Sequence, residues 1–102
     1  GQSIPELPDN PNATRLKYEF GPTDDIGFSN ETRTELFADA AFNEVQTFYS
    51  SVISENGWQI VGTSQESEEI EWKLSKGPSL AEIELEADDD GGVKIKIKRK
   101  DP

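Results

Sequence analysis

Three consecutive aspartates, Asp88, Asp89 and Asp90, precede Gly91-Gly92 and form the densest group of potential metal ligands in this sequence. An acidic run that ends in glycine invites comparison with calcium-binding loops. A calcium loop begun at Asp88 needs a bidentate glutamate at its twelfth position, where Arg99 stands, and its acids alternate with other residues. We therefore expect a solvated hairpin tip with a glycine at positive φ, and no metal site.

Two further carboxylates, Glu69 and Glu71, alternate along a predicted strand and could in principle do acid–base chemistry. Both would lie on the wet face of that strand, where we expect nothing to raise their pKa. The chain contains no histidine and no cysteine, which excludes an imidazole base, a thiolate nucleophile and a zinc–thiolate site. We predict no catalytic residue and no cofactor, and take Asp88–Asp90 with Glu69 and Glu71 as a candidate interaction surface.

The charge of the chain is strongly acidic overall and basic at its end. The net charge is −11, and Lys94–Lys100 holds a large share of the 10 basic residues. An acidic field repels nucleic acid and anionic lipid, so we expect neither as a partner. No apolar run is long enough for membrane insertion.

Cross-strand pairing predicts where the basic segment goes. If Ala87 faces Val93 across the DDDGG turn, isoleucines and leucines meet on the inner face and every outward lysine meets a glutamate. Only Arg99 and Lys100 lack a partner in this register. The predicted outward pairs are Glu86–Lys94, Glu84–Lys96 and Glu82–Lys98, and the inward ones are Leu85–Ile95 and Ile83–Ile97.

Apolar spacing predicts the remaining elements. A 3.6-residue stripe indicates an amphipathic helix over 40–55, with Asp39 as its N-cap and Asn56-Gly57 as its end. Alternating residues indicate strands over 13–20, 28–38, 58–63, 68–75, 79–87 and 93–100. The fold class is therefore α+β: one helix packed on a mostly antiparallel sheet of five or six strands, in the order β-β-α-β-β-β-β.

Residues 1–12 form a proline-rich leader, and residues 13–102 a single domain. We expect Ile4 and Leu7 to anchor the leader to the core. In the first strand, Leu16, Tyr18 and Phe20 should face inward. The aromatic side chains should fill the space between helix and sheet, unless that space holds a ligand cleft; they are Trp58, Trp72, Phe20, Phe37, Phe42, Phe48 and Tyr18.

Several short motifs resemble those of small extracytoplasmic α+β domains in bacterial lipoproteins and secreted proteins. They are Pro11-Asn12-Ala13 at the end of the leader, Asp39 before the helix, Phe48-Tyr49 within it and Asn56-Gly57-Trp58 at its end. The resemblance implies a fold and an export route, and supplies no binding residues. We expect a non-catalytic, monomeric interaction domain outside the cytoplasm that recognises a protein partner; the alternative is a small-ligand binder with a cleft between helix and sheet.

Overall fold

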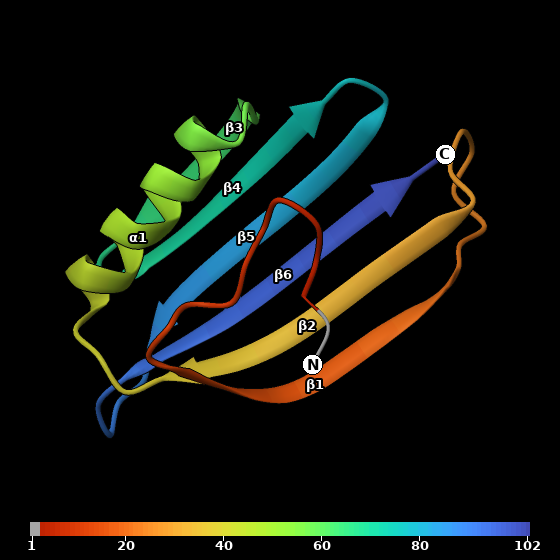
Figure 1. The fold of residues 1–102 in the computed structure, drawn as a ribbon. Helices are drawn as coiled ribbons and strands as arrows, with labels where there is room; N and C mark the ends of the chain where they lie inside the picture. Colours follow the sequence, from red (N-terminus) through yellow and green to blue (C-terminus); the bar gives the residue numbers. More distant parts are fainter. Residues whose placement is uncertain (1–2) are drawn as a thin grey trace.

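The computed structural model describes residues 3–102, which form one six-stranded antiparallel sheet with a single helix on one face (Figure 1). This confirms the α+β prediction. The strand order is β1-β2-β6-β5-β4-β3, so β1 and β3 are the edges. The elements are β1 (Ala13–Pro22), β2 (Asn30–Ala38), α1 (Phe42–Glu55), β3 (Gln59–Glu66), β4 (Glu69–Lys76), β5 (Ser79–Ala87) and β6 (Val93–Asp101).

The helix α1 begins later than the sequence pattern suggests. Asp39 is not its N-cap, because the backbone N–H of Asp39 still donates to Asn12 at the end of the sheet. Ala41 occupies the N-cap position without a side-chain hydrogen bond. The predicted end is confirmed, since Asn56 is the C-cap and Gly57 follows with φ 76°. Within residues 3–102, no helix is long and apolar enough to cross a membrane.

The hairpin of β5 and β6 has the predicted register throughout, from Ala87 facing Val93 to Glu82 facing Lys98. The ammonium of Lys98 lies 3.3 Å from a carboxylate oxygen of Glu82. The strand β6 lies inside the sheet, between β5 and β2. In this central position Lys96 faces an acid on each neighbouring strand, Glu84 on β5 and Glu35 on β2.

The first strand departs from simple alternation. A bulge between Arg15 and Lys17 turns the Leu16 side chain away from the inner face. Leu16 is therefore 67% exposed, and the prediction that it faces inward is wrong. The bulge resets the phase, so that Tyr18 and Phe20 pair with Thr34 and Thr32 on the inner side. Phe20 nevertheless remains 64% exposed because it lies near the open edge.

Two further expectations need correction. Phe37 pairs with Lys94 on the outer face and does not fill the space under the helix. The strand predicted over 58–63 begins one residue later and continues as β3 to Glu66. Trp58 and Trp72 are buried as expected, and belong to one core cluster with Tyr49.

The inner face of the sheet is covered by two different segments. The helix α1 contacts β5 and β3, while the leader crosses in front of β6 (Figure 1). Ile4 and Leu7 of the leader are 1% and 0% exposed, which confirms that they anchor it to the core. The leader is therefore packed into the domain as a short irregular layer beside α1.

The turn between β5 and β6 offers a matched pair of glycine substitutions. Gly91 and Gly92 both have positive φ, at 98° and 82°. A Cβ at Gly91 meets nothing within 4 Å, whereas one at Gly92 lies 2.4 Å from Phe37 Cζ and 2.8 Å from the Ala38 carbonyl oxygen. Gly91→Ala should cost about 1–2 kcal/mol from backbone strain, and Gly92→Ala about 1–3 kcal/mol more from the clash. Urea unfolding of both variants measures the difference; equal losses would show that the clash is relieved without cost.

Candidate functional site

The predicted acidic surface is assembled in part. The β3–β4 and β5–β6 turns lie at the same end of the sheet, joined by a 2.9 Å hydrogen bond from the Ala87 N–H to the Glu68 carbonyl. This brings Glu69 to the same end as Asp88, Asp89 and Asp90. Glu71 lies further along β4, where it faces Glu84.

The three aspartates differ in what they do. Asp88 stabilises its own turn, since its carboxylate accepts from the Asp90 N–H at 3.2 Å and lies 3.5 Å from the Lys94 ammonium. Asp89 and Asp90 are exposed. Within residues 3–102, no group of three or more acidic side chains is arranged to hold a metal ion. The arrangement is that of a hairpin tip with two exposed negative charges.

The expectation that nothing on the wet face would raise the pKa of Glu69 is wrong. Loss of surrounding water and the nearby charges of Glu86, Glu66, Glu84 and Glu71 raise the pKa of Glu69 above its ordinary value of 4.5. Glu69 faces Glu86 directly across β4 and β5. Because the Glu69 side chain is exposed to solvent, we test the second cause of its raised pKa, which is repulsion from these neighbouring carboxylates.

On the inner face, the leader is held by hydrogen-bond donors of the domain. Arg99 Nη1 donates to the Pro5 carbonyl at 2.6 Å, Trp58 Nε1 to the Glu6 carbonyl at 3.0 Å, and the Tyr49 hydroxyl to the Pro8 carbonyl at 3.2 Å. Burial raises the pKa of the Tyr49 phenol, which keeps its proton and remains a donor. These bonds satisfy carbonyls that have no strand partner.

The Glu6 side chain reaches the most polar part of the inner face. Its carboxylate pairs with the Lys76 ammonium and lies 3.1 Å from Arg99 Nη1. Hydrogen bonds from Lys76 and then Arg99 lower the pKa of Glu6. Asp101 and Ser79 complete this group, which we call the Arg99 cluster: Glu6, Lys76, Ser79, Arg99 and Asp101.

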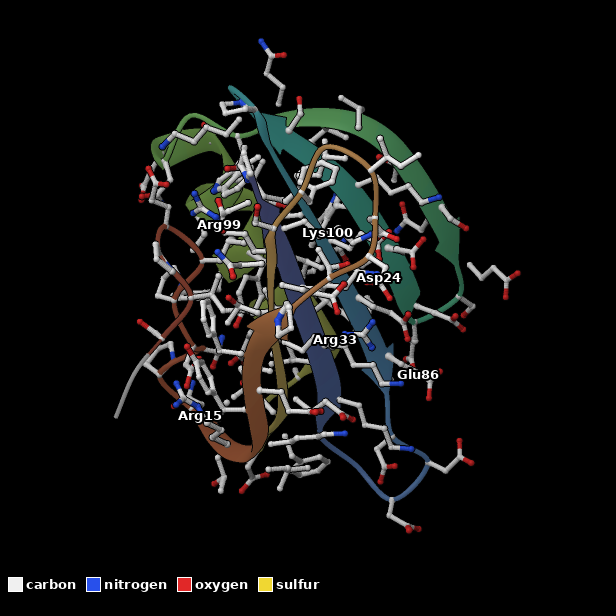
Figure 2. All side chains as sticks on the ribbon, turned by 90° about the vertical axis from the view of Figure 1, so that its right-hand side faces the viewer. Arg15, Asp24, Arg33, Glu86, Arg99 and Lys100 are labelled. Carbon is white, nitrogen blue, oxygen red and sulfur yellow. The ribbon has the colours of Figure 1, made fainter. Side chains whose placement is uncertain are left out.

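Figure 2 shows Arg99 on the side of the sheet that carries α1 and the leader, together with Arg15, while Arg33 and Glu86 point to the other side. Arg15 holds the far end of the leader through Asp9, at 3.0 Å. The Arg99 side chain is 12% exposed and lies over the Trp58 ring, 5.2 Å from its centroid. Arg15 and Arg99 thus both bind the leader from the inner face of the sheet.

The Arg99 cluster has the chemistry of a binding site. The Ser79 hydroxyl donates to Asp101 at 2.6 Å, which superficially resembles a nucleophile beside a base. Asp101 also accepts hydrogen bonds from Arg99 Nε, at 3.0 and 3.2 Å, so both of its carboxylate oxygens are engaged by the guanidinium. A guanidinium and an ammonium beside buried apolar side chains are suited to hold an anion.

Among the shallow depressions of the outer face are two of about 200 and 150 Å³. The larger is lined by acids and bases that pair with near neighbours, such as Lys17 with Glu19 at 2.8 Å and Arg33 with Glu31 at 2.7 Å. Paired surface charges of this kind contribute little to stability or binding. We therefore place the candidate site on the inner face.

The sequence pattern did not predict that Arg99, Lys76 and Glu6 form one site. It predicted that Arg99 and Lys100 have no acidic partner across the β5–β6 hairpin. This is correct, because they face Ala81 and Leu80 there. Both find partners elsewhere: Lys100 binds Asp25 from the β1–β2 loop, and Arg99 binds Glu6 from the leader. The available signal was the phase of VKIKIKRK, in which Arg99 takes the inward position after Val93, Ile95 and Ile97.

Comparison with known proteins gives one match. A family model described as START domain-like matches residues 16–101, which excludes the leader and covers every strand and the helix at least in part. No curated protein and no solved structure matches the chain significantly.

The crowding around Glu69 makes a prediction about pH. Because its folded pKa is raised, ionised Glu69 destabilises the fold at neutral pH, and this penalty disappears as pH falls through the folded and then the unfolded pKa. Glu69→Gln should therefore raise the melting temperature by a few degrees at most at pH 7, and the gain should vanish in acid. Asp89→Asn, which removes one charge from the exposed tip, is the control. Equal gains for both variants at every pH would instead indicate a general effect of net charge.

Proposed function

We propose a function from one premise: the chain belongs to the START domain-like family, whose model spans most of its length. Domains of this kind often bind small ligands. We propose that this chain is a non-catalytic binding domain that holds a small apolar ligand on the inner face of the sheet beside α1, in the space that the leader occupies.

The observation that carries this proposal is the nature of the cover over β6. Elsewhere the inner face is covered by α1, whose backbone bonds are internal, but over β6 it is covered by residues 4–10, which form no helix and no strand of the sheet. An irregular segment held mainly by side-chain donors separates from a domain more readily than a strand or helix does. The apolar side chains beneath it are then open to a ligand.

The energetics of the leader support a detachable cover. Burial of Ile4 and Leu7 contributes about 1.5–3 kcal/mol each, and the three bonds to leader carbonyls about 0.5–1.5 kcal/mol each. Ordering the backbone of residues 4–10 costs about 1–2 kcal/mol per residue. These opposing terms agree to within a few kcal/mol, and Pro5 and Pro8 lower the cost because their φ is already restricted.

An extracytoplasmic location is proposed from the sequence resemblance of Pro11–Ala13 and Asn56–Trp58 alone. Fractionation of the source cells tests it, and recovery of the protein in the cytoplasm would contradict it.

Loosening the leader should increase ligand affinity, because the leader and the ligand compete for one space. With Nile red as a neutral apolar probe, the Ile4→Ser/Leu7→Ser variant should bind at least about tenfold more tightly than the unmodified chain, since loss of either buried side chain alone weakens the closed state by more than the roughly 1.4 kcal/mol that a factor of ten requires. Dye emission and Trp58 fluorescence report the binding.

The matched control is Ile26→Ser, because Ile26 is 99% exposed in the β1–β2 loop and its side chain covers no part of the core. This variant should leave dye affinity unchanged. Amide exchange in α1 and β6 checks that each variant is folded. A folded, leader-released variant that binds no dye would show that the leader is a permanent part of the core, and the proposal would fail.

A second candidate function is recognition of a cationic protein partner by the acidic end of the sheet. The observation that favours it is the convergence of Glu69, Asp89 and Asp90 from two turns, with Glu69 already surrounded by like charges. A cationic partner would relieve that repulsion, and its binding would weaken as salt rises.

Titration with a lysine-rich peptide, followed by backbone NMR, tests this second candidate. Shift changes should concentrate in the β3–β4 and β5–β6 turns, and neutralisation of Glu69, Asp89 and Asp90 should abolish them. The control neutralises Glu44 and Glu55 on α1. Shift changes spread evenly over the acidic surface would indicate unspecific attraction to the net charge of −11.

A further inference from the structure

We propose that the site under the leader takes an amphiphilic carboxylate, and that Glu6 occupies the place of its head group when the site is closed. This inference rests on the proposed function above and deepens it, because it names the chemical class of the ligand and the group that competes with it. Three features of the Arg99 cluster and its surroundings support it.

The first feature is that Arg99 is held in position without the leader. Its Nε donates to Asp101 at 3.0 Å, its Nη2 lies 3.4 Å from the Ser79 hydroxyl, and its guanidinium covers the Trp58 ring. Only Nη1 contacts the leader, at Pro5 and Glu6. When the leader leaves, a fixed guanidinium presents one free edge to the vacated space, and such a donor is preorganised for an oxygen anion.

Lys76 is positioned in the same way. Its ammonium donates to the carbonyl of Asn56 at the end of α1, at 2.5 Å, and pairs with Glu6 of the leader. The helix end therefore keeps this cation close to Arg99 after the leader has left. Two cations approached by one carboxylate can bind its two oxygens separately, as Glu6 shows: Oε2 pairs with Lys76 and Oε1 with Arg99.

The second feature is the balance of charge. Within the Arg99 cluster, Lys76 and Arg99 are matched by Glu6 and Asp101. Departure of the leader removes Glu6 and leaves one positive charge in excess within this cluster, beside the buried Trp58 ring. A neutral ligand would leave donors of both cations without an acceptor, which costs free energy, whereas a carboxylate restores the balance.

The third feature is the form of the leader itself. Glu6 has φ 64°, in the left-handed region that a glutamate rarely adopts. This turn allows Ile4 and Leu7 to enter the apolar cluster with Tyr49 and Trp58, while the carboxylate between them meets the cations. The leader thus presents an anionic head beside two branched apolar groups. An amphiphilic carboxylate has the same combination and fits the same surroundings.

Decanoate and its methyl ester, used below their aggregation concentrations, test the head-group assignment with one apolar chain. Titration calorimetry on the full chain should show decanoate binding roughly ten- to a hundredfold more tightly than the ester, as expected for a charged hydrogen-bond donor. Arg99→Gln should remove this preference; the loosening of the leader that accompanies it strengthens acid and ester binding alike, so the ratio of the two affinities is the readout. Glu6→Gln should strengthen decanoate binding, because the competing carboxylate is gone.

Arg15→Gln is the matched control, since Arg15 also fastens the leader, through Asp9, but lies outside the Arg99 cluster. It should preserve the preference for decanoate over the ester. If Arg99→Gln does not fold, the ratio of acid to ester affinity in the unmodified chain still decides. If the unmodified chain binds acid and ester equally, and also binds Nile red in the separate dye assay, the carboxylate assignment is wrong and the proposed function stands. If it binds neither the dye, the acid nor the ester, both proposals are wrong.

Discussion

One helix is too narrow to cover the inner face of a six-stranded sheet, and the rest of the structure depends on this mismatch. A helix with its side chains is about 10–12 Å across, whereas six strands spaced about 4.8 Å apart span roughly 24 Å. The helix α1 contacts β5 and β3 and leaves β6 and β2 to another segment. The leader supplies that cover with Ile4 and Leu7, both almost fully buried. The inner face therefore has one permanent cover and one that is held by fewer bonds.

A cover without secondary structure must have its backbone carbonyls satisfied by the surface beneath it. Arg99, Trp58 and Tyr49 do this, and each donates from a side chain fixed on the domain. Donors arranged in this way do not depend on the sequence of the segment that they hold, because they bind carbonyl and carboxylate oxygens. The features that dock the leader are thus the same features that would bind an oxygen-bearing ligand, and in the function we propose the closed and liganded states are alternatives on one surface.

Local patterns were enough to predict most of the fold. The helix, the six strands and the full register of β5 and β6 follow from periodicity and from the pairing of Glu82, Glu84 and Glu86 with lysines. The errors lie where a non-local contact overrides the pattern. Asp39 is not the helix cap, because its backbone N–H is bonded to Asn12 just beyond the end of β2. Leu16 is exposed because it is the extra residue of a β-bulge. Neither effect is encoded in the neighbouring residues, since both depend on the strand or segment that lies alongside.

The candidate site shows the same division between local and non-local information. Arg99 is marked in the sequence, because it continues the inward phase of Val93, Ile95 and Ile97 with a charged residue, and a charge enters an apolar face only with partners. The identity of those partners is not marked. Asp101 is two residues away, but Glu6 is 93 residues away and is brought to Arg99 only by the tertiary fold. An inward charge at the end of an alternating strand therefore indicates that a polar site exists there, and the topology decides which distant segment or ligand fills it.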